Sequence, residues 1–99
     1  MIRHIVILQF EKRHGKDFKQ LLEETRPYLA QIPGIVKLSI YQNDSNYVPE
    51  GVCSFGVEIL FKDMKALDLF MQHPKHFEAN AVFEQYLADL PYMVLTHEV

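Results

Sequence analysis

The first apolar segment of the chain carries hydrophobic side chains on both of its faces. Residues 2–10 are rich in Ile and Val, and this composition predicts a β-strand. Side chains alternate between the two faces of a strand, so Ile5 and Ile7 share one face. Val6 and Leu8 then lie on the other face. A strand with one face in water alternates between apolar and polar residues, so this strand requires an apolar layer on each side.

The remaining segments follow an order that specifies the fold. Hydrophobic period and turn residues predict a helix at 18–32, strands at 35–42 and 52–61, a helix from 64 that ends at Pro74, a further helical stretch to 87, and a strand from Tyr92 to Glu98. The order β-α-β-β-α-β is that of a ferredoxin-like α+β domain, in which helices cover one face of an antiparallel four-stranded sheet. No linker interrupts the pattern, so residues 1–99 are expected to form a single domain.

Capping residues and prolines set the helix boundaries. Asp17 and Asp63 are placed to cap helix N-termini, and Pro33-Gly34 should end the first helical segment. Pro27 interrupts that segment and should kink it or split it near Arg26. The apolar face of the next helix is expected to contain Met64, Leu67, Phe70 and Met71.

The strand at 52–61 repeats the two-faced pattern of the first strand. Phe55, Val57 and Ile59 share one face, and Leu60 lies on the other. Because both helical segments lie on one side of the sheet, the chain has no residues left to cover the second side. A second copy of the chain is the simplest cover, which predicts a homodimer through the open face of the sheet.

Composition and charge exclude several classes of partner. The net charge is −3 and the 10 Lys and Arg residues are scattered, so no nucleic-acid partner is expected. No apolar run approaches the roughly 20 residues that span a bilayer, so no membrane association is expected. The single cysteine, Cys53, allows no internal disulfide and fits a reducing compartment. The apolar N-terminal run is too short for a signal peptide, and a cytoplasmic location is expected.

Histidines in two regions of the chain lie beside apolar residues. His4 shares a strand face with Val6 and Leu8, in the layer between sheet and helices. The segment His73-Pro74-Lys75-His76 follows a helix and should bring His76 over the same layer. Burial lowers the pKa of an imidazole and favours the neutral form that acts as a general base. The predicted catalytic residues are His76 and His4, in a small-ligand pocket with Val6, Leu8, Leu22, Thr25, Val57, Phe70 and His73.

Each histidine also has a structural interpretation. His4 is equally well explained as a hydrogen-bonded core histidine. His73 can bond the last carbonyls of the preceding helix and complement its dipole. His73 and His76 are three residues apart, but a third ligand has no evident source, so no metal site is predicted. His14 and His97 are expected on the surface.

Three motifs resemble, in the same order, those of the stress-responsive A/B barrel (Dabb) family. They are Met1-Ile2-Arg3-His4-Ile5-Val6, Ile32-Pro33-Gly34-Ile35 and His73-Pro74-Lys75-His76. The resemblance covers essentially the whole chain and implies a ferredoxin-like protomer whose sheet pairs with that of a second copy in a dimeric α+β barrel. Most members of this family have no established activity, and plant members are linked to stress responses. A few are cofactor-independent enzymes, so the resemblance implies no cofactor.

One enzyme similar to this chain is a plant polyketide cyclase that performs an intramolecular aldol condensation. By resemblance, its catalytic base matches His76 and a further pocket histidine matches His4. The tyrosine that assists the base matches Phe70, and another pocket histidine matches Phe55. Phe70 cannot donate a hydrogen bond to a carbonyl that gains negative charge. Losing one such donor costs on the order of a hundredfold in rate.

Three hypotheses for function follow. The first is a Dabb-like dimer of unestablished activity that holds a small apolar ligand between sheet and helices. The second is a cofactor-independent cyclase or lyase for a polyketide-like or β-keto substrate, with His76 as general base and His4 orienting the substrate. The third is a structural or stress-protective oligomer with a filled core. A cavity that reaches His4 and His76 would favour the first two.

Overall fold

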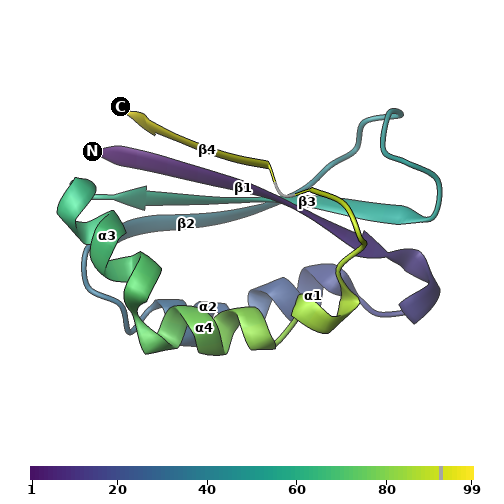
Figure 1. Cartoon of the computed structure of the whole chain (residues 1–99), viewed down its shortest axis with the longest axis horizontal. Helices are drawn as coiled ribbons and strands as arrows, with labels where there is room; N and C mark the ends of the chain where they lie inside the picture. The colour runs from purple at the N-terminus through teal and green to yellow at the C-terminus, as the bar shows by residue number, and fades with distance from the viewer. Residues whose placement is uncertain (92) are drawn as a thin grey trace.

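A computed structural model describes residues 1–91 and 93–99, and it has the predicted ferredoxin-like architecture (Figure 1). The strands are β1 (Ile2–Glu11), β2 (Ile35–Gln42), β3 (Val52–Phe61) and β4 (Met93–Glu98). The helices are α1 (Phe18–Glu23), α2 (Arg26–Leu29), α3 (Met64–Gln72) and α4 (Pro74–Ala81), with one-turn 3-10 helices η1 (Lys12–His14) and η2 (Glu84–Tyr86). The sheet order is β2-β3-β1-β4 and each neighbouring pair is antiparallel. The last strand was predicted to start at Tyr92, which lies outside the described residues.

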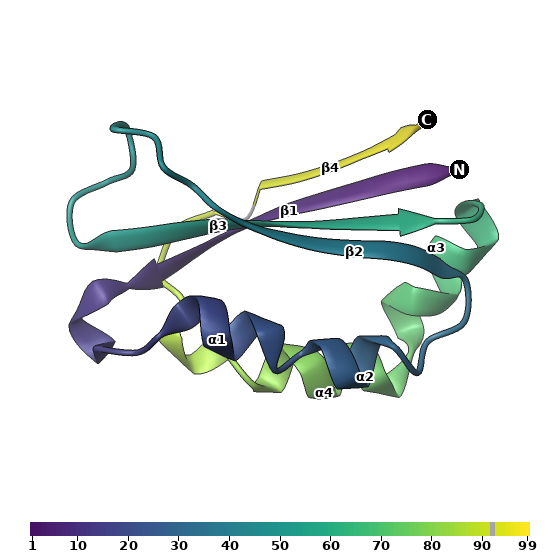
Figure 2. The same ribbon diagram turned by 180° about the vertical axis from the view of Figure 1, so that it is seen from behind.

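The helices lie on one side of the sheet, as Figure 2 shows from behind. On β1 the even-numbered residues point toward the helices, and Ile2, His4, Leu8 and Phe10 are buried there. Val6 shares this face and pairs with Val57 of β3. The predicted strand face is therefore confirmed.

The first helical segment is broken where the sequence predicts it. The Asp17 carboxylate accepts from the Gln20 amide and caps α1. Pro27 lies in the first turn of α2, where its missing N–H costs nothing. Arg26 Nη1 donates to the Leu38 carbonyl at 2.9 Å and so ties the break to β2.

The second helical segment breaks at Pro74, as predicted, since α3 ends at Gln72. Pro74 also begins α4, which was not predicted, because its fixed φ suits a first helical turn. His73 was expected to bond the last carbonyls of α3. Its ring Nδ1 instead accepts from the Lys75 amide at 3.1 Å and caps α4. The helix expected to run to residue 87 ends at Ala81, and η2 follows.

The buried face of α3 also differs from the prediction. Leu67 and Phe70 are buried as expected, together with Ala66. Met64 and Met71 are 49% and 47% exposed, so they do not belong to the core.

The core consists of two clusters of buried side chains. The first core cluster is made of Ile2, Leu29, Ile32, Ile59, Phe61, Ala66, Leu67, Phe70 and Ala79. The second core cluster is made of Leu8, Phe10, Phe18, Leu22, Phe55 and Phe83. Half-buried Val57 packs against both clusters.

No described helix covers the other side of the sheet, which we call the open face. Tyr41, Met93 and Leu95 are exposed there, and an ion pair joins Arg3 Nε to Glu58 Oε1 at 2.9 Å.

The pairing of β2 with β3 shifts between Ile35 and Lys37. Strict alternation would place Ile35 on the open face with Lys37. The shift turns Ile35 toward the first core cluster instead.

Candidate functional site

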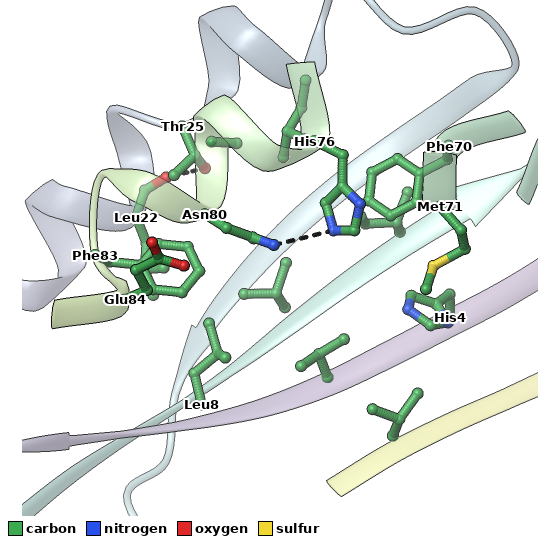
Figure 3. A pocket seen from close by; sticks show the side chains of 16 residues that line it. His4, Leu8, Leu22, Thr25, Phe70, Met71, His76, Asn80, Phe83 and Glu84 are labelled. Carbon is green, nitrogen blue, oxygen red and sulfur yellow. Dashed lines mark hydrogen bonds between the residues drawn. The ribbon is translucent and has the colours of Figure 1, made fainter. Parts of the chain in front are cut away.

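A cavity of about 310 Å³ lies between the sheet and the helices (Figure 3). Its walls are mainly aliphatic and aromatic, with a few polar groups. The lining residues are His4, Val6, Leu8, Leu22, Thr25, Leu29, Val57, Ile59, Phe70, Met71, His76, Ala79, Asn80, Phe83, Glu84 and Val94. The cavity therefore borders both core clusters and reaches both predicted catalytic histidines.

His4 contributes one edge of its ring to the cavity. The β1–β4 register sets His4 opposite Thr96, and His4 Nδ1 lies 2.8 Å from Thr96 Oγ1. Burial lowers the pKa of His4, and repulsion between its charged form and His76 lowers it further. His4 is only 7% exposed and bonds Thr96, as a core histidine would. It also lines the cavity, so both structural interpretations of His4 apply.

His76 lies on the first turns of α4 and is the second imidazole of the cavity. Its Nε2 lies 3.3 Å from Asn80 Nδ2, one helical turn further on. Its Nδ1 is buried and makes no hydrogen bond within the described part of the chain. Burial lowers the pKa of His76, and this outweighs the opposite effect of the Met71 and Phe70 carbonyls. An amide nitrogen can only donate, so the contact with Asn80 Nδ2 favours the tautomer with the lone pair on Nε2 and the proton on Nδ1.

Phe70 lies against both imidazoles. Its ring stacks on His76 with centroids 4.2 Å apart, and it meets the edge of the His4 ring at 6.4 Å. Figure 3 shows the Phe70 and His76 rings side by side at the end of α3. Phe70 thus supplies shape and apolar surface but no hydrogen-bond donor.

The family model of the stress-responsive A/B barrel domain (Dabb) matches residues 2–93. The chain belongs to this family. Among curated proteins, none is similar enough to match it.

Solved structures of other proteins share the fold of this Dabb chain. A Dabb family protein with a ferredoxin-like fold from Mesorhizobium loti is 19% identical, with a TM-score of 0.76 and coverage of 99% of this chain and 95% of that one. A dimeric ferredoxin-like protein of unknown function from Thermobifida fusca is 20% identical, with a TM-score of 0.75 and coverage of 99% and 90%. A Caulobacter crescentus protein, provisionally named an antibiotic biosynthesis monooxygenase, is 17% identical, with a TM-score of 0.78 and coverage of 99% and 88%. At these identities the likeness establishes the fold alone.

Most of the predicted site residues of the Dabb chain come together in the cavity. His4 and His76 are joined there by the predicted binding residues Val6, Leu8, Leu22, Thr25, Val57 and Phe70. His73 does not line the cavity, because its ring is used to cap α4. Phe55, the other position matched to a cyclase histidine, is buried in the second core cluster and also lies outside the lining.

Two polar residues of the cavity were missed by sequence reasoning. Asn80 and Glu84 follow His76 at four and eight residues, and both line the cavity. This spacing was the available signal, because residues four apart share a helix face.

The Thr25 hydroxyl, which also lines the cavity, donates to the Leu22 carbonyl at 2.5 Å, so its proton is already used.

The other histidines and polar groups lie elsewhere. His14 and His97 were expected on the surface, and both are half-buried; the His14 ring packs against Tyr86 at 5.2 Å. Among residues 1–91 and 93–99, no three His, Cys, Asp or Glu side chains gather into a group that could hold a metal ion. No helix in this part of the chain is long and apolar enough to cross a membrane.

Proposed function

We propose that this Dabb chain binds a small, mainly apolar molecule in the cavity between its sheet and helices. The cavity itself is the observation that carries the proposal. Its volume of about 310 Å³ is at the lower end of the range of roughly 300–1,000 Å³ found for small-molecule sites. Apolar walls with a few convergent polar groups are also typical of such sites.

The polar groups define how the ligand would lie. The Asn80 amide and His76 Nε2 are neighbours on one wall, and Val6 and Val57 lie on the sheet side. A ligand oxygen directed at Asn80 would gain a donor, while its apolar part replaces solvent against the sheet. The space left unfilled by side chains favours this function over a purely structural oligomer.

Filling the cavity with a side chain tests the binding proposal. Val6→Phe places a ring in the space that the ligand would occupy, and Val36→Phe adds the same ring at an exposed position of β2. The neutral aromatic amide 1-naphthamide serves as the probe, with affinity measured from methyl NMR shifts. We expect binding to wild type and to Val36→Phe, and a loss of at least tenfold in Val6→Phe. Equal binding by all three proteins would show that the probe lies outside the cavity.

A second candidate function is cofactor-independent proton transfer on a β-keto or polyketide-like substrate. The observation that favours it is a half-buried imidazole at the cavity wall, whose pKa is lowered by burial so that the ring is neutral at neutral pH. In this reaction His76 Nε2 takes the proton from a carbon between two carbonyls, and the electron pair moves to a carbonyl oxygen as an enolate. The enolate carbon then attacks a further carbonyl of the same molecule, outside the β-dicarbonyl unit, and His76 returns the proton to the new alkoxide. No oxidant or metal is needed for this balance.

The developing oxyanion would need a donor in place of the absent tyrosine hydroxyl. Asn80 Nδ2 carries two N–H groups, one of which faces His76 Nε2. That contact would have to open for Nε2 to act as the base, and the amide would then turn its N–H groups to the oxyanion. His4 would orient the substrate from the sheet side through the ring edge not bonded to Thr96. We assign Asn80 the stabilising role and His76 the role of base.

We also propose that the protein is a homodimer formed through the open face. Exposed Tyr41, Met93 and Leu95 on that face support a second copy as its cover. The similar Thermobifida fusca protein is described as dimeric. A cytoplasmic location is proposed as well, because Cys53 is free.

A further inference from the structure

The charges around the cavity are uneven. Of its lining residues, only Glu84 carries a full formal charge at neutral pH, and none is Lys or Arg. Two cations on the neighbouring helices, Arg26 and Lys75, are engaged elsewhere. Arg26 Nε pairs with Glu23 and Lys75 Nζ pairs with Glu78 at 2.9 Å, and none of these four residues lines the cavity.

We infer that the cavity selects uncharged ligands, with a carbonyl, amide or hydroxyl as their polar group, and rejects carboxylates and phosphates. This inference rests on the proposed binding function and adds the chemical class of the ligand. Its basis is the absence of a cation from the described lining together with the Glu84 carboxylate at the rim.

Desolvation supplies the larger part of the selection. A carboxylate loses its hydration shell in an apolar cavity and needs a cation or several donors in return. Here the donors are few, because the Thr25 proton is committed to a carbonyl. His4 and His76 would each first have to bind a proton against the effect of burial. Protonation of one of these rings would also disfavour protonation of the other, because the two positive charges repel.

Glu84 supplies the smaller part and acts as a specificity residue. It lines the cavity and is exposed, so its carboxylate lies near solvent at the edge of the cavity. It repels an approaching anion and can accept from a hydroxyl or amide N–H. Solvent screens an exposed charge, so this contribution is a few-fold change in affinity.

Two ligands of the same shape but different charge separate the effect of charge on affinity from the effect of size. We would titrate 1-naphthamide and 1-naphthoate into the full chain at neutral pH and follow the methyl signals of Val6, Val57 and Val94, which line the cavity. The amide is expected to bind at least about tenfold more tightly than the carboxylate, since one unpaired buried charge costs more than a tenfold change in affinity. Glu84→Gln should narrow this affinity ratio about threefold, because it strengthens the binding of 1-naphthoate and leaves that of 1-naphthamide unchanged. Glu50→Gln, which removes an exposed carboxylate outside the lining, should leave the ratio unchanged.

The outcomes distinguish this inference from the binding proposal. Equal or tighter binding of 1-naphthoate at the same methyl groups overturns the charge selection while ligand binding stands. A ratio that Glu84→Gln and Glu50→Gln alter equally removes Glu84 as the specificity residue. If neither compound moves the cavity methyl signals, the proposed binding function fails, and the charge selection fails with it.

Discussion

The His76 ring is held by stacking on Phe70 and by a second contact with Phe77 at 5.5 Å. These contacts fix the imidazole plane and leave the Nε2 edge beside Asn80. A base positioned in this way loses little freedom when a ligand binds, which is the requirement for efficient proton transfer. Phe70 offers no donor to the site, but in the proposed proton transfer it would orient His76 as the base.

Proton transfer by His76 predicts a specific pH profile. The base must be neutral, and burial lowers its pKa below the ordinary value of 6.5. We expect kcat/KM for a cyclising β-keto thioester to be constant at neutral pH and to fall on acidification at a lower pH than a base with the ordinary pKa of 6.5 would give. His76→Ala should reduce kcat/KM by at least a hundredfold. Product formation would be measured by mass spectrometry.

His14→Ala is the matched control for this experiment, because His14 is half-buried, packs against Tyr86 and lies outside the cavity. It should retain the wild-type rate and profile. Turnover that survives His76→Ala would exclude His76 as the base, whatever ligand the cavity holds.

Sequence reasoning found the two cavity histidines at the residue scale but not their polar neighbour. His4 and Val6 follow from strand alternation, which leaves few choices. Asn80 offers only its spacing of four from His76, which is a weak signal because an amide on a helix is as often solvated as buried. His73 was misplaced because its spacing to His76 does not reveal that Pro74 starts a helix. Because α4 begins at Pro74, the ring of the preceding residue, His73, caps the helix.

The turn between α2 and β2 shows how one glycine fixes the distance between elements. Gly34 has φ +91°, and an added Cβ would lie 2.5 Å from the Cβ of Ala66 on α3. Its carbonyl accepts from the Lys62 amide at 3.0 Å at the end of β3. Two helical segments and two strands thus meet at this residue, with no space for a side chain.

Gly34→Ala is therefore expected to destabilise the protein strongly. The positive φ costs an L-residue about 1 kcal/mol, and overpacking against Ala66 adds roughly 1–3 kcal/mol. We expect the free energy of unfolding in urea to fall by about 2–4 kcal/mol. Gly51→Ala is the matched control, because Gly51 has φ +77° and open space around its Cβ. It should show only the loss of about 1 kcal/mol that the backbone imposes. Similar losses in both variants would show that α3 moves away without cost.

The order of elements followed from the sequence because each strand and helix has a clear hydrophobic period. The details at their ends did not. The shift in β2 pairing at Ile35 depends on how the strand meets β3. The end of α4 at Ala81 depends on tertiary packing, since the residues up to Leu87 continue a helical pattern. Contacts distant in sequence decide both features, and a local pattern does not contain them.

At the scale of the whole molecule, the open face predicts self-association. We expect wild type to sediment as a dimer at micromolar concentration. Leu95, opposite Ile5 on the open face, is 58% exposed in the protomer, so Leu95→Arg should leave the fold intact and place an unpaired charge in the contact. The variant should sediment as a monomer. Leu69→Arg changes a residue of α3 that is 55% exposed and should remain dimeric. A monomeric wild type, or a shift of both variants, would contradict pairing through this face.

A molecule bound in the cavity, which borders both core clusters, would have a second role. It would contact Leu29 and Phe70 of the first core cluster and Leu22 and Phe83 of the second, which at present share Val57. It would thus complete an interior that the sequence leaves incomplete, and its binding free energy would add to the free energy of unfolding. The cellular supply of that molecule would then set how much of the protein escapes proteolysis. The cellular amount of the protein would then rise and fall with the amount of this ligand.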